Sequence, residues 1–176
     1  MPQYKSEFSF SNKAMRMLWG ITWLLLFRPS PRPLFIWRNF ILKIFGAKID
    51  AGARVYPSAR IWAPWNLTIK TNSVLGDRVD CYNVGSITIG ENSIVSQDSV
   101  LCSATHDYNL PEFPLIIRPI ELKENVWVAS HAFISPGVTL QAGTVIGAKS
   151  LVIKNTEEWT VYGGNPAKPI KPRKRF

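Results

Sequence analysis

From residue 49 onward, large apolar residues recur at every sixth position, and this period organises most of the chain. The positions are Ile49, Val55, Ile61, Leu75, Cys81, Val95, Leu101, Leu122, Val128, Ile134, Leu140, Ile146 and Val152. Ile69 and Ile89 join this series if two extra residues are inserted before each. Short repeats of this kind predict a parallel β-helix, in which three hexapeptides make one triangular coil.

The fifth residue of most hexapeptides is small, as at Ala53, Ser73 and Ala132. A small side chain there lets the chain turn a corner while the aliphatic residue fills the interior. Glycine, asparagine and aspartate next to the corners, as in Gly90-Glu91-Asn92, supply the turn conformations. The repeats amount to roughly five coils stacked about 4.8 Å apart. We therefore expect a mainly β fold with a single apolar column inside.

The interruptions of the period fall at one edge of this expected prism. One face carries the repeats that begin at Ile61, Cys81, Leu101 and Ile134. The two-residue insertions Leu67-Thr68 and Ile87-Thr88, and a long loop over residues 107–121, all follow that face. Loops on a rigid scaffold are where binding and catalytic sites are usually built. This edge is therefore the place to look for chemistry.

Two apolar helices are expected before the repeats, over residues 12–27 and 33–45, with the proline-rich stretch RPSPRP between them. The most apolar part, Met17 to Phe27, is too short to span a bilayer and lacks the small-residue cleavage site of a secretory signal. Two interpretations stay open. The helices cap one end of the core, or residues 12–45 contact a membrane peripherally, with Trp19, Trp23 and Trp37 at the interface.

We expect three segments along the chain: an apolar, basic helical segment at residues 1–46, the β-helix with its loop at residues 47–157, and a basic C-terminal tail at residues 158–176. The formal net charge is +9, yet residues 1–48 hold eight Lys and Arg against Glu7 alone, and residues 168–176 hold five and no acid. The body between them has more acidic than basic residues. A nucleic-acid-binding protein would usually carry its basic stripe on the folded core, so this distribution argues against that class. Basic ends suit anionic small molecules or membrane surfaces.

Cysteine and histidine are sparse. Cys81 and Cys102 are the only cysteines and have neither metal-ligand nor redox spacing, which suits a reducing, cytoplasmic compartment. The two histidines, His106 and His131, are too few for a three-histidine zinc site such as that of the trimeric carbonic anhydrases on this fold. We expect no metal.

His106 is the candidate for chemistry, because it stands at the last place of its hexapeptide, at the mouth of the long loop. A neutral histidine can accept a proton from a hydroxyl group. At a corner, one ring nitrogen would be exposed while a local carbonyl or carboxylate holds the other. A purely structural corner histidine fits the sequence as well.

Three stretches carry a resemblance to a known family: SITIGENSIVSQDSVLCSATHDY, ELKENVWVASHAFISPGVTLQAGTVIGAKSLVIKN and YGGNPAKPIK. In this order they resemble the hexapeptide-repeat acetyltransferases of the galactoside, maltose and nodulation type, and most of all those of colanic acid biosynthesis. The resemblance covers nearly the whole chain. It implies a left-handed β-helix, acetyl-CoA as acyl donor, a sugar or glycan acceptor, and a homotrimer with active sites between subunits.

The resemblance also implies roles for single residues. His106 would be the general base. The positions that correspond to the family's CoA channel are Trp127, Ser130, Ala148 and Lys154, and Lys168 and Lys171 correspond to basic residues that meet the CoA phosphates. Ile153 departs from the family, where a polar residue is common.

Three further residues are candidates for the acceptor side, namely Asp80, Asn83 and Asp107. Asp80 and Asn83 lie one coil before His106 and could bind a sugar or orient the imidazole. Asp107 could fix the tautomer of His106 or simply begin the loop. The expected activity is O-acetylation of a saccharide for a surface polysaccharide. N-acetylation of an amino sugar and a non-catalytic scaffold remain the alternatives.

Overall fold

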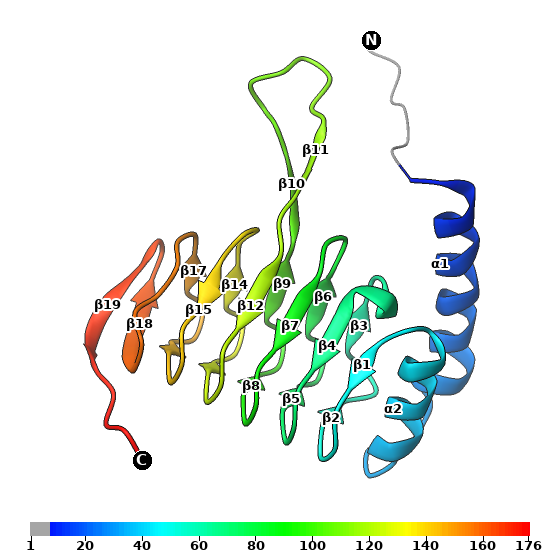
Figure 1. The fold of residues 1–176 in the computed structure, drawn as a ribbon, viewed down its shortest axis with the longest axis horizontal. Coiled ribbons are helices and arrows are strands. Elements are labelled where there is room, and N and C mark those ends of the chain that lie inside the picture. The colour runs from blue at the N-terminus through cyan, green and yellow to red at the C-terminus, as the bar shows by residue number, and fades with distance from the viewer. Residues whose placement is uncertain (1–7) are drawn as a thin grey trace.

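The computed structural model describes residues 8–176, which form a parallel β-helix with two helices at one end and a protruding hairpin (Figure 1). The helical elements are α1 (Phe10–Thr22), its π-helical continuation η1 (Trp23–Phe27), α2 (Phe35–Ile44) and the 3-10 turn η2 (Pro64–Asn66). The first face consists of β1 (Lys48–Ile49), β4 (Leu67–Ile69), β7 (Ile87–Ile89), β12 (Ile120–Leu122) and β15 (Thr139–Leu140). The second consists of β2 (Arg54–Val55), β5 (Val74–Leu75), β8 (Ile94–Val95), β13 (Trp127–Val128), β16 (Val145–Ile146), β18 (Thr160–Gly164) and β19 (Ala167–Pro172). The third consists of β3 (Arg60–Ile61), β6 (Asp80–Tyr82), β9 (Val100–Cys102), β14 (Phe133–Ile134) and β17 (Leu151–Val152).

The period of six is confirmed by the core. All fifteen aliphatic and cysteine positions of the series are buried in one continuous cluster. Strand register also confirms the grouping by threes, since Ile61, Cys81, Leu101 and Ile134 follow one another in adjacent strands of the third face. The three faces give five complete coils, and β18 adds a sixth, partial one.

Asparagines stack at the corner between the first and second faces. Asn72, Asn92 and Asn125 each have a φ between 54° and 59°. This left-handed conformation is accessible to asparagine at low cost because its short polar side chain can bond locally. Each coil therefore turns at the same place.

The helices cap the open end of the first coil. Within the coil stack, the N–H of one coil donates to the carbonyl of the next, as from Arg54 N to Ser73 O at 2.8 Å. No coil precedes the first one, so its carbonyls receive no N–H groups from a neighbouring strand. Helical side chains donate to four of them: Trp19 Nε1 to Ile61 O (2.6 Å), Trp23 Nε1 to Ala59 O (2.9 Å), Arg38 Nε to Val55 O (2.6 Å) and Asn39 Nδ2 to Ala53 O (2.7 Å). The capping interpretation is thus confirmed for the inner side of the helices.

Arg38 is fully buried beneath the turn that joins η1 to α2. Its guanidinium also donates to Ser30 Oγ and to the carbonyls of Pro31 and Arg32, so the buried charge is well hydrogen-bonded. Burial lowers the pKa of Arg38, although the carboxylate of Asp77 opposes this effect. An arginine remains charged in proteins despite such a shift.

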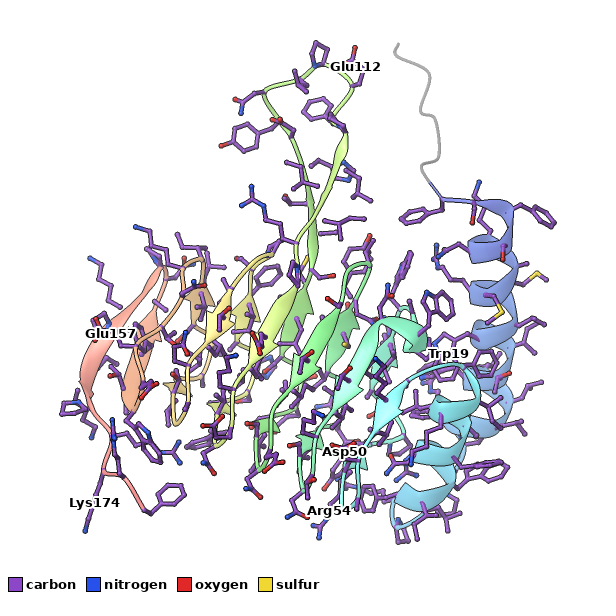
Figure 2. All side chains as sticks on the ribbon, in the orientation of Figure 1. Trp19, Asp50, Arg54, Glu112, Glu157 and Lys174 are labelled. Carbon is purple, nitrogen blue, oxygen red and sulfur yellow. The ribbon has the colours of Figure 1, made fainter. Side chains whose placement is uncertain are left out.

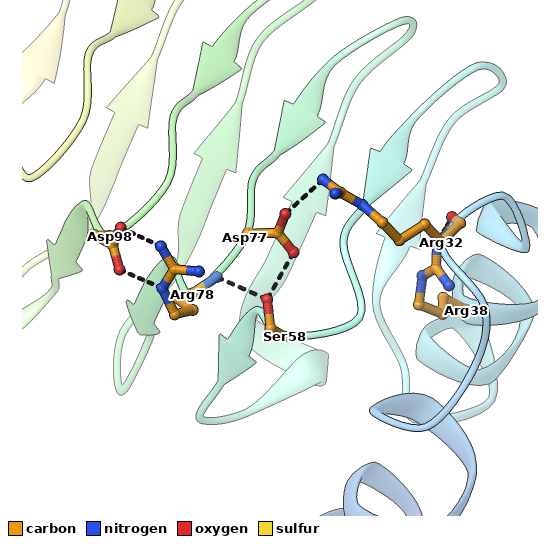
Figure 3. A network of polar contacts seen from close by, with 6 residues as sticks. All are labelled: Arg32, Arg38, Ser58, Asp77, Arg78 and Asp98. Atoms are coloured by element: carbon orange, nitrogen blue, oxygen red, sulfur yellow. Dashed lines mark hydrogen bonds and ion pairs between the residues drawn. The ribbon is translucent and has the colours of Figure 1, made fainter.

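A polar network continues from this turn into the coils (Figure 3). Arg32 Nη2 lies 2.7 Å from Asp77 Oδ2, and Ser58 Oγ donates to Asp77 Oδ1 at 2.8 Å. The backbone N–H of Arg78 donates to Ser58 Oγ, and its guanidinium forms a double contact with Asp98. The hydrogen bonds to Asp98 raise the pKa of the Arg78 guanidinium. The same bonds lower the pKa of the Asp98 carboxyl. The network joins the helical end to the second and third coils.

The long loop is a β-hairpin. Strand β10 (Ala104–His106) pairs antiparallel with β11 (Leu115–Ile117), and the tip near Glu112 projects far from the coils (Figures 1 and 2). The excursion therefore begins at Ala104, three residues before the expected Asp107. As expected, it leaves the edge that follows the third face. None of the helices described over residues 8–176 has the length and apolarity required to cross a membrane.

Candidate active site

The root of the hairpin is fixed by Ser103, which is fully buried. Its hydroxyl donates to Tyr82 O at 3.0 Å and accepts from Gly85 N at 2.9 Å. On the returning strand, Arg118 N donates to Ser103 O at 2.9 Å. The hydroxyl bonds tie Ser103 to the preceding coil, and the Arg118 bond joins the two legs at the root, so residues just beyond the root are held in a defined position.

His106 lies three residues from this root, at the end of β10, and is exposed. Its Nδ1 is 2.6 Å from the carbonyl oxygen of Phe113, on the other leg of the hairpin. A carbonyl can only accept, so Nδ1 must carry the hydrogen. In the neutral imidazole Nε2 is then the unprotonated nitrogen with a free lone pair. The expected arrangement, with one ring nitrogen held by a local carbonyl, is confirmed.

Asp107 stands next to the histidine but serves the hairpin turn. Its Oδ1 accepts from Asn109 N at 3.0 Å, and its own N–H donates to Pro114 O at 2.9 Å. The group that orients the imidazole is the Phe113 carbonyl. No sequence signal could have identified it, because a backbone carbonyl is common to every residue type.

Asn83 is fully buried, and its amide is used inside the chain. Oδ1 accepts from Ala63 N at 3.0 Å, and Nδ2 donates to Ala63 O at 2.5 Å. Both polar atoms thus close the turn of the previous coil and do not face an acceptor. Asp80 is exposed on the outer side of β6, next to Arg60 and Val100 in the neighbouring strands. Partial burial raises the pKa of the Asp80 carboxyl, and the charge of Arg60 opposes this shift.

The cofactor candidates lie on another edge of the prism. Ser130 and Ala148 occupy the turns between the second and third faces, one coil apart, and Lys149 N donates to Ser130 O across them. Trp127 lies just before this edge on the outer side of β13, where its Nε1 donates to Ser96 Oγ at 3.0 Å. Ala148 is exposed, so its small side chain leaves the backbone accessible to an extended ligand.

The basic candidates lie beyond the last complete coil. Lys154 follows β17, while Lys168 and Lys171 belong to β19, which pairs antiparallel with β18. All three side chains are exposed, and none takes part in an ion pair within the described residues. These charges are available to anionic groups such as phosphates.

The structure therefore separates the expected base from part of the expected cofactor channel. His106 and Lys154 follow the third face, whereas Ser130 and Ala148 precede it. Within residues 8–176 there is also no cluster of three or more His, Cys, Asp or Glu side chains that could hold a metal ion. Cys81 is fully buried, which raises the pKa of its thiol.

Comparisons with known proteins show which family the chain is similar to. No protein-family model matches the chain. The chain is 40% identical over 166 residues to the colanic acid biosynthesis acetyltransferase WcaF of Escherichia coli K12, covering 94% of this chain and 91% of that protein. It is 32% identical over 123 residues to galactoside O-acetyltransferase of the same organism, covering 68% of this chain and 55% of that protein.

Solved structures have the same fold. A hexapeptide-repeat acetyltransferase of Vibrio cholerae, complexed with acetyl-CoA, superimposes with a TM-score of 0.86 at 21% identity, over 97% of this chain and 93% of that one. A galactoside acetyltransferase in complex with coenzyme A gives a TM-score of 0.80 at 25% identity, over 95% of this chain and 84% of that one.

Proposed function

The chain belongs to the hexapeptide-repeat acetyltransferases, as a relative of the colanic acid biosynthesis enzymes, and we propose that it acetylates a saccharide hydroxyl with acetyl-CoA as donor. The acceptor we propose is a sugar or glycan used to build a surface polysaccharide. The observation that carries the mechanism is the 2.6 Å contact between His106 Nδ1 and the Phe113 carbonyl. It leaves Nε2 as a proton acceptor on an exposed and rigidly rooted hairpin.

In the proposed reaction, His106 Nε2 removes the proton of the acceptor hydroxyl as its oxygen attacks the carbonyl carbon of the thioester. The tetrahedral intermediate collapses with cleavage of the carbon–sulfur bond. The imidazolium returns the proton to the CoA thiolate, so the products are an acetyl ester and free CoA. While the ring is protonated, the Phe113 carbonyl accepts from Nδ1 and stabilises the charge.

The remaining candidates receive roles in the same proposal. Trp127, Ser130 and Ala148 line the pantetheine arm, and Lys154, Lys168 and Lys171 meet the phosphates of CoA. Asp80, on the coil before the base, and Asp107, the residue next to it, are assigned to the acceptor side, although one oxygen of Asp107 also accepts from Asn109 N. Asn83 takes no part in this assignment, because its amide is already bonded to Ala63.

We propose a homotrimer with prisms side by side, because the base and the Ser130–Ala148 edge lie on opposite sides of the third face. The outer sides of the strands support this arrangement. The second face presents an apolar ladder of Val74, Ile94, Trp127 and Val145, whereas the first face presents Lys48, Thr68, Thr88, Glu121 and Thr139. An apolar outer face suits contact with a second subunit. We place the enzyme in the cytoplasm, with residues 12–45 available for contact at the inner face of the membrane.

The test is the release of CoA thiol from acetyl-CoA in the presence of a panel of sugars, with amino sugars included. The His106→Ala variant should lower kcat by roughly 10²–10⁴-fold, because it removes the general base. His131→Asn is the matched control, since asparagine tolerates the left-handed φ of 59° at that position. The control should keep kcat within about twofold. Equal activity of the His106 variant and the unchanged chain would refute the mechanism.

A further inference from the structure

Helix α1 and its continuation η1 are apolar on two opposite sides. The inner side packs on the coils through Trp19 and Phe27, which are buried. The outer side exposes Met17, Leu18, Ile21, Leu24, Leu25 and Leu26. A helix that only caps a core would show polar residues toward water. The outer side therefore has the composition of a contact surface.

Helix α2 extends the same surface. Its exposed apolar residues are Ile36, Trp37, Phe40 and Ile44. Trp37 Nε1 donates to Leu26 O at 3.1 Å, and the rings of Trp37 and Phe40 lie 6.3 Å apart. The two helices thus present one continuous area, which we call the helical plate: the exposed apolar residues of α1, η1 and α2. Figure 2 shows side chains projecting from both helices at the end of the molecule, beyond the coils.

Charge decides which occupant fits the helical plate. Residues 8–49 contain seven Lys and Arg and no Asp or Glu. Lys13, Arg28 and Lys43 are exposed around the apolar residues. A second copy of the plate would bring the same positive charges face to face, which opposes such a dimer. An anionic lipid surface offers both the opposite charge and an apolar interior.

We propose that the helical plate docks on the surface of an anionic lipid membrane. The apolar side chains enter the boundary between headgroups and acyl chains, and the lysines and arginines meet lipid phosphates. The helices lie on the membrane and do not cross it, consistent with their length. Trp37, with 40% of its surface exposed, sits at the interface, where tryptophan is favoured.

Membrane docking adds a location to the proposed function and rests on it only through the proposed trimer. The plate covers the end of the coil stack, so its outer side faces along the long axis of the molecule (Figure 1). In a cyclic trimer with prisms side by side, three plates face the same way. Three weak contacts on one surface bind far more tightly than one. Acetyl transfer would then occur next to the membrane, on a saccharide presented there by a lipid carrier.

The test is co-sedimentation of the full chain with vesicles of phosphatidylcholine, with and without phosphatidylglycerol. We expect binding to the anionic vesicles and loss of binding at about 0.5 M NaCl, where surface charges are screened. Ile21→Ser with Leu25→Ser should weaken binding by about tenfold or more. The matched control is Ile170→Ser on β19, because Ile170 is 65% exposed and Leu25 is 63% exposed. Lys43→Gln should weaken binding by about fivefold, and Lys174→Gln, in the C-terminal segment, should not.

The outcomes separate this inference from the proposed function. Activity on a soluble sugar should survive in the Ile21/Leu25 variant, since neither residue touches the proposed site. The inference is overturned if the unchanged chain stays in the supernatant with anionic vesicles, or if the variant binds them equally well. It is also overturned if the variant changes oligomeric state in size-exclusion chromatography, because the plate would then be a protein interface. Loss of activity in His106→Ala with intact vesicle binding leaves the inference standing.

Discussion

The role of Asn83 in the structure differs from the role expected from its position in the sequence. Its place one coil before His106 made it a candidate for the acceptor site. In the folded chain its amide is buried and holds the backbone of Ala63 from both sides. A buried amide with both ends satisfied stabilises the fold but has nothing left to offer a ligand.

Asn83→Ala should therefore lower the free energy of unfolding by about 1–3 kcal/mol, since it leaves the N–H of Ala63 buried without a partner, while the Ala63 carbonyl keeps its bond from Asn66 N. Urea denaturation followed by circular dichroism measures this. Asn155→Ala is the comparison, because Asn155 Oδ1 also accepts from a backbone N–H, that of Thr139, but at an exposed position. Its effect should stay below about 1 kcal/mol. If Asn83→Ala kept full stability and lost activity, the acceptor role would be restored.

The sequence predicted the parts of the molecule that repeat. Each inward aliphatic residue, the order of the faces and the edge with the insertions follow from a period of six, because the same packing problem is solved in every coil. Hydrogen bonds that occur only once in the molecule could not be predicted from the repeat. The Phe113 carbonyl beside His106 depends on how the two legs of the hairpin pair, and the start of that hairpin at Ala104 depends on the buried hydroxyl of Ser103.

Among the elements, strand β19 carries two of the proposed phosphate ligands, pairs with β18 and is followed by an arginine that anchors its C-terminal end. Arg173 Nη1 donates to Asn125 O at 2.7 Å and to Gly143 O at 2.9 Å, at the corner between the first and second faces. Its guanidinium also lies over the rings of Trp159 and Phe176. The clamp is close-packed, because a Cβ at Gly143 would lie 2.4 Å from the Trp159 ring.

Arg173→Ala should loosen β19 while the coils remain folded. We expect faster amide hydrogen exchange in residues 167–172 and a KM for acetyl-CoA that rises by several-fold, with little change in kcat, because Lys168 and Lys171 lose their fixed positions. Lys174→Ala is the control, since its side chain is exposed at the next position. Unchanged exchange in β19 would show that the strand does not depend on this clamp.

At the scale of the whole molecule, the trimer can be tested through the ladder on the second face. Ile94→Glu places a charge beside Val74 and Trp127 and should reduce the assembly to monomers in size-exclusion chromatography with light scattering. Thr88→Glu adds the same charge to the polar first face and should leave the assembly unchanged. A monomer in the unchanged chain would contradict the proposal.

Sharing of the site between subunits predicts complementation. His106→Ala and Ala148→Trp should each be inactive alone, the first without the base and the second with a blocked channel. In mixed trimers the intact His106 of one chain meets the intact Ala148 of its neighbour, so about a quarter of the interfaces should regain activity. Mixtures that stay inactive would mean that both residues act within one chain.

The common direction of the hydrogen bonds between coils also affects how many coils such a protein can have. Every coil offers the same row of backbone carbonyls to the coil before it, so nothing in the repeat itself determines how many coils form. The number of coils is limited by the structures that cap the two ends. Indole, guanidinium and amide donors from the helices bond to the carbonyls of the first coil, and β18 with its antiparallel partner β19 covers the last one. A chain without its helices would expose the unpaired carbonyls of the first coil, and such an open strand edge favours aggregation with other copies.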